Sequence, residues 1–382
     1  MRSASIKLLL SFFVLNLLYA ELKGIELFNK LSNDTLFVAV NILLLTAWML
    51  YLYLTKDIFG VFKLEPLFVL LFFTLLVLIF IQMLPATNLI GSRKRLEFIG
   101  SLFFNILILI TIGRERDFNI ANGLVIAGGL MVSFSLINVA RVGFDSRLLV
   151  GALSDDYQRL GRVSGLMILY PLFSSTENVK RQAIIFSLGI IGLLISVQRA
   201  PWVACILIYL ITFLFRSRSI SYLKQIVAPR NILVLLLLIA VISYSGAKAR
   251  FNYVIERFAS ERSGLGSLSH GKSNERIYLY DKALDLIAQN LLSGVGFGNF
   301  SKSAKVVNRH PHNIFLELWV ELGLFGMVLF ALIVYLSIKR NKGSPVLIPF
   351  LYFLVNSQVG GDIVDNRIMW VLLLNLFIIN RD

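Results

Sequence analysis

The residue types that could do chemistry gather between Arg309 and Phe330, in the sequence RHPHNIFLELWVELGLFGMVLF. This segment begins with His310 and His312, two of the chain's three histidines, and continues directly into an apolar run. A neutral imidazole can accept a proton near pH 7, so the two histidines place ionisable groups at the start of the apolar run. The alternative is a membrane helix whose first turn is merely capped by His312 and Asn313.

Two glycines, Gly323 and Gly326, follow in the same apolar run. If the run forms one continuous helix, a rotation of about 100° per residue returns Gly323 to within roughly 20° of the face of His312. Glycines on that face would allow a neighbouring helix to approach closely. Glu317 and Glu321 then lie on the opposite side, and we expect them to pair elsewhere in the helix bundle.

The composition indicates a polytopic membrane protein rather than a soluble one. Of the 382 residues, 57% are hydrophobic and 15% are charged, and the mean hydropathy is +0.78. Apolar runs of about 15–22 residues recur along the chain, long enough to cross a hydrocarbon core of about 30 Å. The one cysteine, Cys205, lies inside such a run. It therefore offers neither an intramolecular disulfide nor a cysteine-based metal site.

We predict an all-α fold with about twelve transmembrane helices. The expected order is helices 1–6 in residues 1–182, helices 7–9 in 183–246, a long outer loop with short amphipathic helices in 247–312, and helices 10–12 in 313–382. The predicted spans are residues 5–20, 35–54, 66–84, 96–112, 118–140, 163–176, 183–198, 200–215, 231–246, 313–337, 345–361 and 367–380.

Lysine and arginine in short loops set the predicted orientation. Basic loops at 216–230 and 339–342 fall on one side of the membrane when the spans alternate, and so do smaller basic clusters at 56–63, 114–116 and 180–181. That side is predicted to be the cytoplasm, where both termini would also lie. The long segment 247–312 then lies outside, which is the periplasm in a Gram-negative cell.

Positive charge is also predicted on the outer side. Residues 93–95, Arg-Lys-Arg, lie in one outer loop, and four more arginines lie between residues 141 and 162. Since this charge opposes the orienting bias, we expect it to bind anionic groups, because guanidinium forks grip phosphate oxygens. The alternative is pairing with nearby aspartates or lipid headgroups. The candidates for substrate binding are Arg93, Arg95, Arg141 and Arg162.

Arg199 lies between two apolar runs with almost no loop between them. An arginine at the centre of a membrane helix costs about 2.5–3.5 kcal/mol, and less toward the interface. Arg199 should therefore face a polar cavity, pair with an acid, or extend to the membrane interface.

A second candidate cation, Arg276, opens a segment whose apolar residues recur at helical spacing. The spacing predicts an amphipathic helix lying on the outer face, followed by the flexible turn GVGFGNF. Arg276 is then either a group of the site or a solvated surface charge. The apolar residues of the predicted helix are Ile277, Tyr280, Leu284, Ile287 and Leu291.

Three of these segments resemble a known family. The pair HN at 312–313, nine residues, and then GLFG at 323–326 is similar to the H-N-x9-G-x-x-G signature of the O-antigen ligase and O-antigen polymerase superfamily. The segment SVQR at 196–199 resembles the family's arginine between two helices. The segment NER at 274–276 and the helix after it look like the second-arginine segment of its outer loop. The resemblance covers about residues 183–335.

The resemblance implies a metal-independent, inverting glycosyltransferase that needs no cofactor and acts on a glycan linked to undecaprenyl diphosphate. Arg199 and Arg276 would stabilise the departing diphosphate. His312 would act as the base, orient the acceptor or bind the diphosphate. Further candidates for substrate binding, the last three toward acceptor sugars, are Asn313, Asp362, Asp365 and Arg367.

The acceptor separates two forms of this activity. The sequence GGDIVDNR at 360–367 resembles polymerases more than ligases, and the outer loop is compact for a ligase. We therefore favour a polymerase, with a ligase acting on lipid A-core as the alternative. The expected partners are the lipid-linked glycan and the bilayer, with other polysaccharide-assembly membrane proteins as candidates and no nucleic acid.

A transporter of lipid-linked sugars is the competing class. A transporter built from two equivalent halves should show related hydropathy in both halves. Here the one large hydrophilic loop lies late in the chain, and the candidate reactive residues gather around it. This asymmetry favours an enzyme.

Overall fold

The computed structural model describes residues 66–85, 91–92, 94–100, 120–142, 156–174, 178–196, 198–215, 272–306 and 309–377. These residues form helices joined by turns, without a strand, so the all-α prediction is confirmed for this part of the chain. Packing divides the chain into two compact units. One consists of Met1–Lys56 with Asn119–Ser267, and the other of Asp57–Phe118 with Leu268–Asp382. The linear division of the chain by membrane topology stays a prediction.

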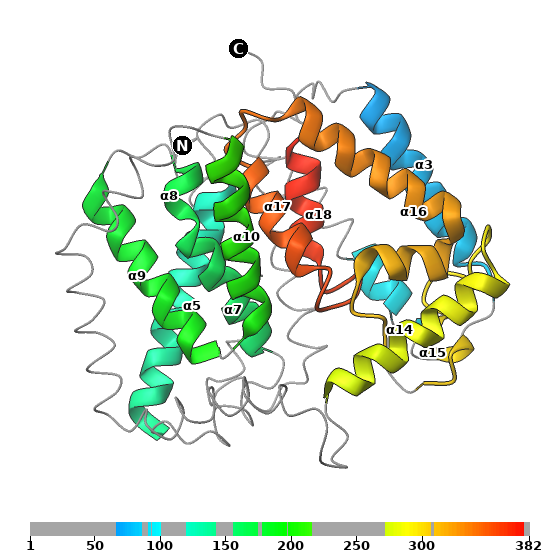
Figure 1. The fold of residues 1–382 in the computed structure, drawn as a ribbon, viewed down its shortest axis with the longest axis horizontal. Coiled ribbons are helices and arrows are strands. Elements are labelled where there is room, and N and C mark those ends of the chain that lie inside the picture. Colours follow the sequence, from blue (N-terminus) through cyan, green and yellow to red (C-terminus); the bar gives the residue numbers. More distant parts are fainter. Residues whose placement is uncertain are drawn as a thin grey trace, which may run out of the picture. The chain divides into compact units, whose positions relative to one another are not determined.

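The first unit is a bundle of helices from the middle of the chain, drawn in cyan to green in Figure 1. Three of its helices match predicted spans closely, those expected at 118–140, 183–198 and 200–215. Its helices are α5 (Ile120–Val142), α7 (Asp156–Ile168), α8 (Tyr170–Phe173), α9 (Val179–Ser196) and α10 (Arg199–Phe215).

The span predicted at 163–176 is wrong in its bounds. The helix α7 begins earlier, at Asp156, and is separated from the short α8 at Leu169. Pro171 explains the separation, because proline has no N–H to continue the hydrogen bonds of α7. Arg162, which was predicted to lie in an outer loop, lies within α7.

Small residues bring α5, α7 and α9 close together. A Cβ on Gly192 of α9 would overlap the Ser164 hydroxyl of α7 and lie 2.6 Å from Val132 Cγ2 of α5. A Cβ on Gly189 would lie 2.7 Å from the Ser164 carbonyl oxygen. Helices in a membrane associate through such close contacts, because lipid supplies no hydrophobic force between them.

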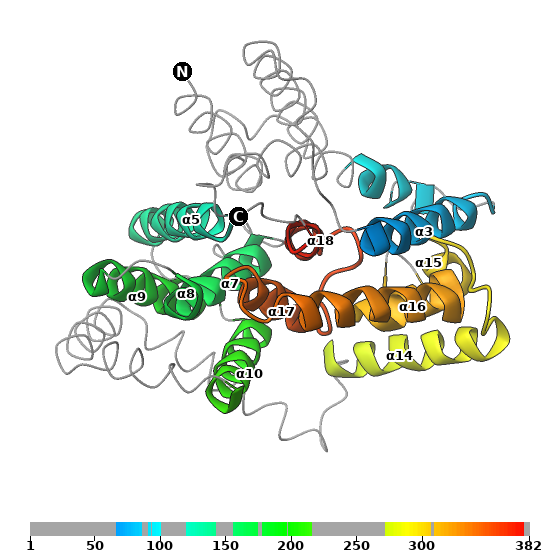
Figure 2. The same ribbon diagram turned by 90° about the horizontal axis from the view of Figure 1, so that it is seen from above.

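The second unit combines an early helix with the C-terminal part of the chain (Figures 1 and 2). The predicted spans 66–84, 313–337, 345–361 and 367–380 correspond to helices here, although α17 and α18 are shorter than predicted. Its helices are α3 (Pro66–Gln82), α14 (Lys272–Gln289), α15 (Phe300–Ser303), α16 (Ile314–Arg340), α17 (Leu347–Asn356) and α18 (Arg367–Asn375).

Two of the described helices, Val179–Ser196 and Ile314–Arg340, are long and apolar enough to cross a membrane. Together with the composition, they support an integral membrane protein. The count of about twelve spans stays a prediction, since the spans expected at 5–20, 35–54 and 231–246, and most of the one at 96–112, lie outside the described residues.

The amphipathic helix predicted after Arg276 is present as α14, but its apolar stripe is divided. Ile287 is buried, together with Leu279 and Ala283, in a cluster with residues of α15 and α16. Ile277 and Leu284, which belong to the predicted stripe, are exposed. The sequence spacing therefore located the helix correctly and placed only part of its buried face.

Candidate active site

The helix α16 is broken at Gly323, which has φ 74° and ψ −175°. In Figure 1 its first piece, which begins at Ile314, lies beside α14, and the second piece runs beside α3. His312 precedes the helix and has a positive φ of 56°. The prediction that His312 and Gly323 share one face of a continuous helix is therefore wrong, because the helix starts after His312 and stops at Gly323.

The loop after α14 replaces the hydrogen bonds that the break removes. Val295 N–H donates to the Val320 carbonyl at 2.9 Å, and Gly296 N–H donates to the Glu321 carbonyl at 3.1 Å. On the other side of the break, Leu324 N–H donates to a carbonyl of the same loop. Buried backbone groups need such partners, most of all at membrane depth.

Two glycines make this contact between loop and helix possible. A Cβ on Gly323 would overlap the carbonyl oxygen of Leu292, and a Cβ on Gly294 would lie 2.6 Å from the carbonyl oxygen of Glu321. Gly294 also has a positive φ, 69°. The turn GVGFG, expected to be flexible, is thus a well-defined partner of the break in α16.

The His312–Asn313 motif lies at the start of α16. Asn313 is the N-cap, and its side-chain oxygen accepts a hydrogen bond from the N–H of Leu316 at 3.0 Å. Its side-chain nitrogen donates to the carbonyl of Gln358 at 3.4 Å. These two contacts fix the half-buried His312 beside the turn that connects α17 and α18. The ring of His312 meets the ring of His310 edge to face, with 4.1 Å between centroids.

Glu317 and Glu321 lie one turn apart on the first piece of α16, and both are buried. Lys94 Nζ lies 2.5 Å from Glu317 Oε1 and 2.9 Å from Glu321 Oε1. The prediction that the two glutamates pair elsewhere in the bundle is confirmed. Burial disfavours the charged ammonium, but the neighbouring carboxylates outweigh it and raise the pKa of Lys94 above its usual value. Lys94 is therefore a cation at neutral pH.

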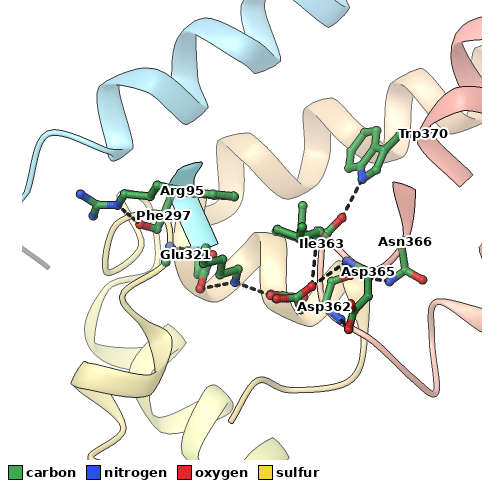
Figure 3. A network of polar contacts seen from close by, with 12 residues as sticks. Arg95, Phe297, Glu321, Asp362, Ile363, Asp365, Asn366 and Trp370 are labelled. Carbon is green, nitrogen blue, oxygen red and sulfur yellow. Dashed lines mark hydrogen bonds and ion pairs between the residues drawn. The ribbon is translucent and has the colours of Figure 1, made fainter. Parts of the chain in front are cut away.

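Arg95, predicted to bind substrate, holds backbone carbonyls in this structure. Its Nε donates to the carbonyl of Phe297 at 2.8 Å (Figure 3), and its Nη1 donates to the carbonyls of Met83 and Pro85. These bonds tie the end of α3 to the loop that fills the break. A contact of Arg95 with substrate stays a prediction.

The GGDIVDNR segment forms the turn before α18. Asp362 Oδ1 accepts hydrogen bonds from the N–H groups of Val364 at 2.9 Å and Asp365 at 2.8 Å. The carbonyl of Asp362 accepts another from the side chain of Asn366, and Figure 3 shows this compact turn. Asp362 thus shapes the turn that presents Arg367, the first residue of α18.

The candidate residues divide between the two units. The second unit contains the exposed Arg276, in the first turns of α14, as well as His312 and Asn313. It also contains Arg95, Asp362 and Arg367. The first unit contains Arg199, the first residue of α10, and Arg141 and Arg162, within α5 and α7. Arg93 lies outside the described residues.

The helices and this site define a membrane protein with charged groups buried beside a discontinuous helix. Residues 184–331 match the family model described as O-antigen ligase. The matched range contains Arg199, Arg276, His312 and the break at Gly323. The match confirms the resemblance to the O-antigen ligase and polymerase superfamily, and it indicates a glycosyltransferase-type enzyme that acts on lipid-linked glycans in a membrane. A search of curated proteins by sequence finds no match.

Proposed function

We propose that this protein is an inverting, metal-independent glycosyltransferase that acts on undecaprenyl-diphosphate-linked glycans at the periplasmic face of the inner membrane. The observation that carries the proposal is the His312–Asn313 turn, fixed at the start of a broken helix inside the segment that matches the O-antigen ligase family. Discontinuous membrane helices typically line binding sites.

The proposed reaction is a single displacement. The acceptor hydroxyl attacks the anomeric carbon of the donor sugar, and the bond to the diphosphate oxygen breaks with its electron pair. His312 takes up the hydroxyl proton or orients the acceptor. Arg276 and Arg199 stabilise the negative charge of the departing lipid diphosphate, a task that fixed guanidinium groups perform without reorganisation.

We further propose polymerisation of lipid-linked repeat units as the overall reaction. A polymerase must hold two polyprenyl diphosphates, the leaving group of the donor and the anchor of the acceptor. The additional outward arginines would serve this second diphosphate, and the Asp362–Arg367 turn would contact acceptor sugars. These additional arginines are Arg93, Arg95, Arg141 and Arg162.

A ligase that transfers the glycan to lipid A-core is the second candidate, because the matching family model is described as O-antigen ligase. Both reactions use the same donor and the same catalytic groups. They differ only in the hydroxyl that attacks. The two functions therefore have to be separated by the acceptor rather than by site residues.

The test uses the purified protein in liposomes that contain lipid-linked repeat unit as the only substrate. A polymerase yields a ladder of longer lipid-linked chains, and His312→Ala should abolish the ladder at an equal amount of protein. A product that forms only after lipid A-core is added, and on that acceptor, identifies a ligase. Translocation of the lipid-linked sugar with no new glycosidic bond under either condition would contradict the enzyme and support a transporter.

A further inference from the structure

We propose that Lys94 is a positioning residue for the reaction, since its ion pairs with Glu317 and Glu321 hold the broken helix α16 against the loop 291–298. The inference rests on the proposed glycan transfer, because positioning has meaning only for a reaction. Its structural part concerns the junction of loop and helix and can be measured without substrate.

Lys94 connects the first piece of α16 to the loop through one short chain of contacts. Its ammonium reaches both glutamates, and Glu321 lies two residues before the break at Gly323. The second oxygen of Glu321 accepts a hydrogen bond from the N–H of Gly298 at 3.0 Å. One carboxylate thus joins a buried cation to the end of the loop that fills the break.

The same loop is held from two further sides. Phe297 N–H donates to the carbonyl of Gln82 at the end of α3 at 2.9 Å, and the Gln82 side chain donates to the carbonyl of Ser293 at 2.8 Å. The ammonium of Lys94 also lies 5.4 Å from the centre of the Phe297 ring. Loop, break and α3 therefore meet at one junction, with Lys94 inside it.

This junction is connected to two of the proposed catalytic residues. The first piece of α16, which carries Glu317 and Glu321, begins directly after His312 and Asn313. The buried side chains of α14, the helix of Arg276, pack in one cluster with Val320 of that same piece. A displacement of the first piece of α16 would thus be transmitted to His312 and to Arg276 together.

Removal of the Lys94 charge should disturb this junction. Two buried carboxylates one turn apart repel each other, or one of them takes up a proton. In either case we expect the Glu321 carboxyl group to leave the position in which it accepts the hydrogen bond from the N–H of Gly298. Misplacement of reacting groups by about 1 Å can lower a rate about 100-fold, even when the change is remote from the chemistry.

The first experiment compares wild-type protein, Lys94→Met and Lys94→Arg in liposomes with lipid-linked repeat unit. We expect Lys94→Met to lower kcat about 100-fold with the donor KM within about twofold, because the binding groups remain. Lys94→Arg can also bridge two carboxylates, so its kcat should be at least about tenfold higher than that of Lys94→Met. The control is Lys339→Met at the far, exposed end of α16, which should behave as wild type.

A second measurement is independent of activity. Backbone hydrogen exchange in the peptide covering 291–299 should become at least about tenfold faster in Lys94→Met, because the Gly298 bond to Glu321 is weakened. Unchanged exchange with unchanged kcat overturns the proposal. If wild-type protein transfers nothing to either acceptor, the proposed function fails, whereas the exchange result still decides the structural part.

A triple variant, Lys94→Met with Glu317→Leu and Glu321→Leu, separates positioning from stability. Well-packed hydrophobic residues of similar volume often replace buried ion pairs without loss of folding, but they cannot accept the hydrogen bond from the N–H of Gly298. We expect this variant to insert normally and still to show a kcat about 100-fold below wild type. Recovery of wild-type kcat would overturn the proposal. Failure of both variants to insert would also overturn it, because the ion pairs would then serve folding alone.

Discussion

The two units of the protein use glycine for opposite purposes. In the first unit, Gly189 and Gly192 lie inside the regular helix α9, where they let α7 and α5 approach. In the second unit, Gly294 and Gly323 have positive φ angles and allow a loop to enter a helix. The glycines of α9 thus serve the packing of a continuous helix, whereas those of the second unit serve the interruption of α16.

The difference teaches how a membrane protein can accommodate polar groups. Where regular helices pack closely, as α9 does against α7 and α5, the backbone groups are already paired within each helix and the contact needs no polar partner. A break frees carbonyl and N–H groups, and these must find partners elsewhere. In the second unit the loop 291–298 supplies them, and the buried Lys94, Glu317 and Glu321 lie beside the break.

The largest effect should come from closing the space at the break. Gly323→Ala places a methyl group on the Leu292 carbonyl oxygen in a backbone conformation that is essentially restricted to glycine. We expect a loss of about 4 kcal/mol in the free energy of unfolding. Thermal unfolding in detergent measures it. Gly343→Ala is the control, because no atom lies within 4 Å of its added Cβ. Equal melting temperatures would refute the strain at Gly323.

The second effect concerns the two arginines that we propose to stabilise the leaving group. Arg276→Ala and Arg199→Ala should each lower glycan transfer at least about 100-fold while the protein still inserts, since a cation that stabilises the leaving group is lost. Lysine at either position should restore little, because it lacks the planar fork of arginine. Transfer rates at matched protein levels are the measurement. A near-normal rate in an alanine variant would remove that arginine from the site.

A smaller effect is expected where glycine only permits close packing. Gly192→Ala should cost about 1–3 kcal/mol, because its Cβ meets Ser164 and Val132 but its backbone is helical. Gly129→Ala in α5 meets no atom within 4 Å and should be neutral or slightly stabilising. Thermal unfolding of both variants checks the comparison. If Gly192→Ala were as damaging as Gly323→Ala, packing and interruption could not be distinguished in this way.

No effect is expected from removal of divalent metal ions. Transfer should continue at its full rate in EDTA, because arginines rather than a cation held by carboxylates would stabilise the diphosphate. In the part of the chain that the structure describes, no group of three or more His, Cys, Asp and Glu side chains is arranged to hold a metal. Loss of activity on chelation, with recovery in magnesium or manganese, would contradict this account.

Helix positions were largely predictable from the sequence, since apolar length and polar boundaries locate α3, α9, α10 and the start and end of α16. The break inside α16 was not. A glycine in an apolar run is the same sequence signal whether it lets a neighbouring helix approach closely or interrupts its own helix. What decides between them is the partner of the freed carbonyls, and that partner lies in the loop 291–298, distant in sequence.

Lys94 was the residue missed by reasoning from the sequence, which selected its neighbours Arg93 and Arg95 instead. A signal was present. Glu317 and Glu321, one turn apart in an apolar run, require a cationic partner when buried, and Lys94 belongs to a basic outer segment. Periodicity along one helix cannot identify a partner on another segment, so the pairing becomes visible only in the folded structure.

The interruption of α16 also bears on how the chain assembles. The amides of Val295 and Gly296, which satisfy the carbonyls of Val320 and Glu321, are synthesised before α16. The donors are thus already available when this helix enters the bilayer, where an unsatisfied carbonyl costs several kcal/mol. In the reverse order, α16 would enter the bilayer with unpaired carbonyls before the loop that pairs them had been synthesised. The order of elements along the chain thus allows the interrupted helix α16 to enter the membrane together with the loop that pairs its carbonyls.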